Sequence, residues 1–254
     1  MLSVSERAVL YAALLLATAA AWSATWMQTS DLPGSSPLLA RALCGGAWTM
    51  ASAASSWVMW ISMMVAMMLP ATAPTVEAFA TIARRRRARH EAHVPAFVFV
   101  AGYGLAWALF SAVAVGAQWQ LYRAALLAPN MQNTSPVLAG MALLIAGLYQ
   151  FTPLKRACLR GCRNPLSFIV AEWREGYSGA MLMGLRHGLN CVGCCWAVML
   201  LMFCVSVMDL RWAAALGVYA AIERLAPGGE TIIAPAFGAA AIVGGAALLG
   251  LSLL

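Results

Sequence analysis

Charged residues are scarce in this sequence. Asp, Glu, Lys and Arg make up 10% of its 254 residues, and hydrophobic residues make up 63%. An ordinary soluble domain is about 25% charged, and its core does not need this much apolar surface. The composition therefore predicts a single integral membrane domain over residues 1–254.

Other absences exclude whole classes of function. The chain has no G-x-x-x-x-G-K-[ST] motif and no large polar domain, so it is not a self-contained ATP-driven pump. It has only three histidines, two of them in a basic loop, which argues against a two-haem or multi-histidine copper site. Seven unevenly placed cysteines do not form a secreted disulfide framework. In such a chain the net charge of +7 is first an orientation signal, so we expect no nucleic-acid partner.

Apolar segments recur along the chain at the length of membrane helices. A run of about 20 uncharged residues is long enough to cross the hydrocarbon core. We predict an all-α polytopic bundle of about seven transmembrane helices, and the short sixth segment leaves open six spans plus a re-entrant piece. The segments are residues 8–27, 54–75, 95–118, 136–151, 188–208, 212–225 and 232–254.

Basic residues predict the orientation of this bundle. With seven spans and a cytoplasmic amino terminus, 13 of the 16 basic residues face the cytoplasm, which leaves Arg41, Arg123 and Arg211 outside. The positive-inside rule favours this arrangement. We therefore expect a multi-pass bacterial inner-membrane protein that contacts membrane lipid, with its amino terminus in the cytoplasm and its carboxyl terminus outside.

The fifth segment carries the strongest chemical signal. His187, Cys191, Cys195 and Met199 are four residues apart and form one stripe on a helix, with Cys194 beside it. Thiolate, imidazole and thioether are donors that soft or borderline metals prefer. The neighbouring glycines permit either a close helix approach or a broken helix start: Gly184, Gly188 and Gly193.

Methionines form a second sulfur-rich face in the second segment. Met59, Met63 and Met67 are four residues apart, as are Met64 and Met68. Methionine is also adaptable core packing, so this face has a purely structural interpretation as well. If the second and fifth helices pack together, we expect the two sulfur clusters to meet. Pro70 and Pro74 then predict a kink or an end of the second helix.

Two further cysteines and three glutamates lie near the expected cytoplasmic boundary. Cys158 and Cys162 are one helical turn apart in a basic segment, where a reducing compartment keeps thiols available for a metal. Glu77, Glu172 and Glu223 could couple protons, but salt bridges with Arg224 or with the basic loops are the simpler expectation.

The chain resembles a bacterial family described as predicted metal-binding integral membrane proteins. The resemblance covers about residues 57–228. It implies metal binding without implying a substrate or a reaction. Its motifs are the methionine segment that ends in Leu69-Pro70, the segment from Tyr149 to Lys155, the His187-Gly188-x-x-Cys191-x-x-Cys194-Cys195-Trp196 core, and Glu223 before Pro227-Gly228.

Donor softness indicates the metal. No carboxylate lies beside the cysteines, which disfavours manganese, magnesium and calcium. Zn(II) would accept three cysteines and a histidine, but the methionine face favours Cu(I). The predicted ligands are His187, Cys191, Cys194, Cys195, Met63, Met64, Met67, Met68, Cys158 and Cys162.

The leading hypothesis is a non-enzymatic copper-binding protein. It would translocate Cu(I) or deliver it to a membrane metalloenzyme or a copper chaperone. Two alternatives stay open. One is a membrane oxidoreductase or metal-dependent enzyme subunit, and the other is a structural subunit of a larger complex that holds a stabilising metal.

Overall fold

Helices account for nearly all of the regular structure. The computed structural model describes residues 2–29, 49–91, 93–127, 133–207 and 209–252. Within these ranges the β structure is limited to isolated bridge positions, among them the antiparallel bridge between Leu127 and Asn133. The predicted all-α class is therefore confirmed for the described residues. In chain order, the helices are α1 (Val4–Thr29), α3 (Met50–Ala88), α4 (Ala96–Arg123), α5 (Pro136–Tyr149), α6 (Pro153–Arg163), α7 (Pro165–Ala171), α8 (Gly176–Met199), the 3-10 turn η1 (Leu200–Phe203), α9 (Leu210–Leu225), the π-turn η2 (Gly229–Ile233) and α10 (Ala234–Ser252).

Local capping residues define several helix starts. Thr49 and Ser52 form a reciprocal capping box at the start of α3, and the Thr152 hydroxyl accepts from Lys155 N at the start of α6. Asp209 caps α9 in the same way, through the amides of Arg211 and Trp212. These caps satisfy amide donors that helix geometry leaves without a partner.

Five helices among the described residues are long and apolar enough to cross a membrane: α1, α3, α4, α8 with η1, and α10 with η2. The two remaining predicted spans correspond to α5, with 14 residues, and α9, with 16 residues. Both are shorter than the roughly 20 residues of a straight span. The helices α5 and α6 are related by a bend of 69° and could together form one broken span. The count of seven spans therefore stays a prediction.

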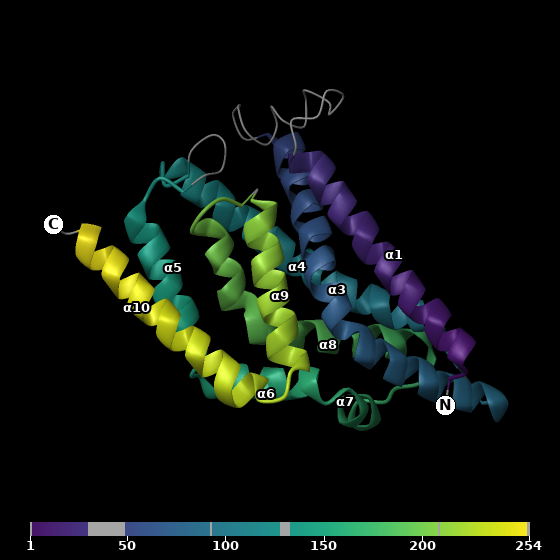
Figure 1. Cartoon of the computed structure of the whole chain (residues 1–254). Helices are drawn as coiled ribbons and strands as arrows, with labels where there is room; N and C mark the ends of the chain where they lie inside the picture. Colours follow the sequence, from purple (N-terminus) through teal and green to yellow (C-terminus); the bar gives the residue numbers. More distant parts are fainter. Residues whose placement is uncertain (1, 30–48, 92, 128–132, 208, 253–254) are drawn as a thin grey trace.

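Two helices extend beyond the predicted membrane segments. Helix α3 does not end at Pro70 or Pro74 but continues to Ala88, and Figure 1 shows it changing direction along its length. Helix α8 begins at Gly176, 12 residues before the expected start at 188. His187 therefore lies inside a continuous helix, which excludes a broken helix start at this position.

The helices pack so that α3 and α8 are linked by their neighbours. Helix α4 packs along α8 and also against α3, and α9 packs against α3. Helix α6 crosses beneath α8 at the same end of the bundle as the short α7 (Figure 1). The volume enclosed by α3, α4, α6, α8 and α9 contains the largest buried core cluster.

Candidate functional site

Both predicted sulfur-rich faces point into this core. His187, Cys191, Cys194, Cys195 and Met199 of α8 are all at most 2% exposed. On α3, the methionines are buried to a similar degree, with Met67 the most exposed at 3%. The helical spacing therefore predicted correctly which side of each helix is buried. The α3 set is Met59, Met63, Met64, Met67 and Met68.

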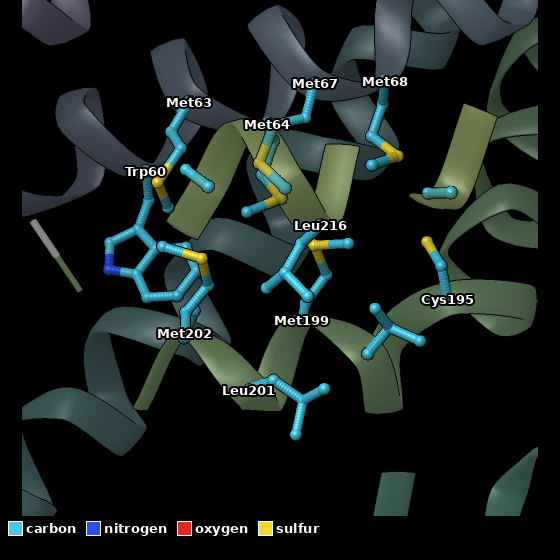
Figure 2. Close-up of a cluster of buried hydrophobic side chains, with 14 of the residues drawn as sticks. Trp60, Met63, Met64, Met67, Met68, Cys195, Met199, Leu201, Met202 and Leu216 are labelled. Atoms are coloured by element: carbon cyan, nitrogen blue, oxygen red, sulfur yellow. The ribbon is translucent and has the colours of Figure 1, made fainter. Parts of the chain in front are cut away.

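The sulfur atoms of the two faces form one continuous group. Figure 2 shows Met63, Met64, Met67 and Met68 facing Met199 and Met202, with Cys195 beyond Met68. All of these residues belong to one buried cluster. The two faces therefore share one buried cluster, and α3 and α8 are linked mainly through α4 and α9 instead of by direct packing of one on the other.

Two polar side chains from other helices connect the faces. The Tyr103 hydroxyl of α4 donates to the Met68 carbonyl at 3.2 Å and lies 3.1 Å from Cys191 Sγ. Arg224 of α9 places Nη1 3.3 Å from Met68 Sδ and Nη2 3.4 Å from Cys194 Sγ. The same Nη2 lies 3.5 Å from the Cys191 carbonyl oxygen. Sequence reasoning did not identify Tyr103, and it placed Arg224 at the membrane boundary.

Helix α6 brings its two cysteines to the same region. Cys158 and Cys162 both pack against the buried cluster that contains Cys191 and Cys194. Cys158 Sγ lies against Gly193, where a Cβ atom on the glycine would come within 2.7 Å of it. Every cysteine in the described part of the chain is unbonded to another cysteine. A glycine at position 193 therefore leaves room for the Cys158 thiol beside the α8 thiols.

The thiols are neighbours, but they do not converge on a common point. Among the described residues, no three His, Cys, Asp or Glu side chains are arranged to hold a metal ion. The thiols of Cys194 and Cys195 instead donate to the Cys191 carbonyl of their own helix, at 3.1 and 3.0 Å. A metal ion would need these side chains to rotate out of their backbone hydrogen bonds.

His187 occupies the edge of this region. Its Nε2 lies 2.9 Å from the Thr72 hydroxyl of α3, and its ring packs among Phe99, Tyr103 and Phe168. Its Nδ1 is buried without a hydrogen-bond partner in the described residues. The imidazole is thus held by Thr72 and by aromatic packing, and its predicted role as a ligand stays a prediction.

A buried ion pair adjoins the cysteine cluster. Lys155 Nζ of α6 lies 2.6 Å from Glu223 Oε1 of α9, and the side chains are 1% and 0% exposed. The Tyr219 hydroxyl donates to the same carboxylate oxygen at 2.9 Å. Arg163 donates to the Glu223 and Arg224 carbonyls, so it covers the carboxyl end of α9. Glu223 was expected to pair with Arg224 or a basic loop, and its partner is Lys155 of the basic segment.

The other two glutamates pair near the same end of the bundle. Glu77 of α3 lies 2.8 Å from Arg7 Nε of α1. Glu172 forms an ion pair with Arg186 of α8. Glu172 thus pairs with a residue of the basic segment, as expected, whereas the partner of Glu77 lies on α1 instead of in a basic loop.

Comparison with known proteins gives a family for the chain. The family model described as "PpoB2: Copper chaperone" matches residues 57–248. This range starts where the sequence resemblance starts and extends beyond it, and its description specifies copper. No curated protein and no solved structure matched the chain. Because the match covers well over half of the sequence, the chain belongs to the PpoB2 copper chaperone family.

Proposed function

We propose that this protein binds Cu(I) inside its helical bundle and delivers it to a membrane enzyme or a soluble chaperone. The main support is one buried cluster, in which cysteine thiols from α6 and α8 adjoin the methionine face of α3. Thiolate and thioether are the ligands that Cu(I) prefers. The copper description of the family supports the same metal.

The cysteines and methionines have different roles in this proposal. Cys191 and Cys194 of α8 lie in the buried cluster and Cys162 of α6 packs against it, so these thiols are the strongest candidates for the resting Cu(I) ligands. Metal binding requires thiols to lose their protons, which gives each thiolate a stronger bond than a thioether. The methionines would therefore pass the ion along and the cysteines would retain it.

The order of the sulfur atoms supports a transfer path. Figure 2 shows the side chains in sequence from Met63 and Met202, through Met64 and Met199, to Met68 and Cys195. Helix α3 runs from Met50 at one end of the bundle, so its first methionines are nearer to that end than Met68 is (Figure 1). We propose that copper moves between this end and the cysteines.

The placement of basic residues supports a direction for this path. The start of α1, the end of α3, all of α6 and the end of α9 lie at one end of the bundle (Figure 1). The arginines of α3 and α6 and Lys155 are therefore on the same side. Arg123 lies at the end of α4 and Arg211 in the first turn of α9, and both are at the other end of the bundle. By the positive-inside rule, the first end is cytoplasmic, so the methionine end of the proposed path is the one nearer to the outside.

Anaerobic Cu(I) competition against a chromogenic chelator tests the proposal. We expect the purified wild-type protein to bind Cu(I), and the Cys191→Ser/Cys194→Ser/Cys195→Ser variant to lose that binding. Cys204→Ser is the matched control, because Cys204 Sγ contacts the Ala139 carbonyl at 3.6 Å, outside the thiol group. Copper binding that survives the triple substitution would exclude this site.

A further inference from the structure

Arg224 is a buried cation inside the sulfur cluster. Its side chain comes from the last turn of α9, and the residue is 4% exposed. Its two terminal nitrogens contact Met68 Sδ, Cys194 Sγ and the Cys191 carbonyl oxygen. Its Nε has no hydrogen-bond partner among the described residues. The guanidinium is therefore held against the proposed copper ligands by sulfur and carbonyl contacts.

The charge of Arg224 is not cancelled by a carboxylate. In the part of the chain that the structure describes, its neighbour Glu223 is paired with Lys155 at 2.6 Å, and no ion pair includes Arg224. The Arg163 guanidinium of α6 is directed at the carbonyls that end α9. An arginine side chain stays protonated in proteins. A fixed positive charge therefore adjoins the thiols whether or not a metal is bound.

We propose that Arg224 determines which metals this site accepts, by favouring monovalent over divalent cations. The repulsion between a fixed positive charge and a bound ion is proportional to the charge of the ion. A divalent ion such as Zn(II) thus meets twice the repulsion of Cu(I) at the same position. This difference in repulsion between Arg224 and the two ions is the same for any number of thiolate ligands, provided that both ions bind at the same position.

The inference rests on the proposed copper site and adds its selectivity. Cu(I) and Zn(II) have the same number of electrons and both bind thiolates, so at a fixed set of thiolate ligands their charge is a property by which the protein can separate them. Ag(I) and Cd(II) form a second pair of this kind. One unit charge at about 5 Å in a protein-like medium corresponds to a selectivity on the order of 100-fold.

The test compares metal selectivity in neutral variants of Arg224. We would measure the affinities of detergent-purified protein for Cu(I), Zn(II), Ag(I) and Cd(II) in wild type, Arg224→Met and Arg224→Gln. Removal of the charge is expected to shift both monovalent-to-divalent affinity ratios toward the divalent ion, on the order of 100-fold. Arg186→Gln is the control, because Arg186 lies on α8 but pairs with Glu172 at the surface and should leave the ratios unchanged.

A second variant keeps the arginine and neutralises its charge. Ala220 is fully buried one turn before Arg224 on α9, so Ala220→Asp places a carboxylate on the same helix face. We expect the same shift of the ratios in this variant. Melting temperatures of all variants identify any loss of folding, and a purely structural role would weaken the binding of both ions together without changing their ratio.

The outcomes separate the two proposals. If wild type binds Cu(I) through its cysteines and the ratios stay constant in the folded Arg224 and Ala220 variants, the selectivity role is wrong and the copper site stands. If the cysteine variants bind Cu(I) as wild type does, the copper site is wrong, and the selectivity role fails with it.

Discussion

Buried charges show how single residues shape this molecule. Lys155 and Glu223 are fully inside the bundle and pair with each other, whereas Arg224 faces sulfur atoms. Placing ions in an apolar interior costs several kcal/mol each, and an ion pair recovers this only with good geometry and further hydrogen bonds. Tyr219 supplies such a bond to Glu223. The two neighbours on α9 therefore have different environments.

The Lys155–Glu223 pair should show strong energetic coupling. Lys155→Met or Glu223→Met alone leaves one buried charge without its partner and should lower the free energy of unfolding by about 3–5 kcal/mol. The double variant buries two apolar side chains and should be more stable than either single variant. Reversible unfolding in mixed micelles measures all three. Additive losses in the double variant would mean that the pair is not coupled.

The thioethers of α3 should affect the rate of copper transfer more than its equilibrium binding. Met64→Leu and Met67→Leu retain the packing volume and should change stability by less than about 1.5 kcal/mol. We expect slower Cu(I) transfer to an acceptor chelator in stopped-flow mixing, with an affinity close to that of wild type. Met141→Leu on α5 is the control, because this side chain is exposed. Unchanged rates in both α3 variants would leave their methionines with a packing role alone.

At the scale of whole helices, the contact between α4 and α8 positions the cluster. A Cβ atom on Gly184 of α8 would collide with the Phe99 carbonyl oxygen of α4, and one on Gly188 would come 2.5 Å from the Ala106 Cβ atom. Small residues allow two backbones to approach this closely. The glycines in the sequence were compatible with either a close approach of another helix or a broken start of α8. The structure shows the close approach, between α8 and α4.

Gly102→Ala tests this helix contact against a matched control. Its added Cβ atom would collide with the Met181 carbonyl oxygen and lie 2.9 Å from Leu185 N, whereas Gly104 has nothing within 4 Å. Overpacking should cost Gly102→Ala about 1–3 kcal/mol of unfolding free energy. It should also weaken Cu(I) binding, because α4 packs along α8 and its displacement would shift the α8 helix that carries Cys191 and Cys194. Gly104→Ala should be neutral or slightly stabilising, since alanine favours helix. Equal stability of the two variants would contradict the tight contact.

For the whole molecule, the ends of the chain indicate its topology. The start of α1 lies at the end of the bundle that holds most of the described basic residues, and α10 leads the chain to the opposite end (Figure 1). If the short helices α5 and α9 both contribute to crossings, the termini are on different sides of the membrane.

Side-specific reporters can check this topology. We expect a reporter fused to the amino terminus to report a cytoplasmic location and one fused to the carboxyl terminus to report an outside location. The seven-span arrangement with 13 basic residues on the cytoplasmic side favours this orientation. A reporter moved to the junction of α6 and α7 should report the cytoplasm. Both termini on one side would exclude the seven-span arrangement.

By itself, the sequence determined the helical class, the buried faces and the chemical nature of the core. These properties are local: apolar length predicts membrane helices, and a spacing of four residues places Cys191 and Cys195, or Met63 and Met67, on one face. Helix ends were predicted less well, because hydropathy drops at Arg186 and Pro70 while the backbone hydrogen bonds of α8 and α3 continue past them.

Only the tertiary structure decided which helices meet and where their charges go. The contacts of Arg224 with Met68 and Cys194 join residues that are 156 and 30 positions apart, and Lys155 pairs with Glu223 across two helices. No periodicity within one segment contains this information. It depends on the packing of α4 against α8 and α9 against α3, through which side chains from separate helices surround one buried cluster of sulfur atoms.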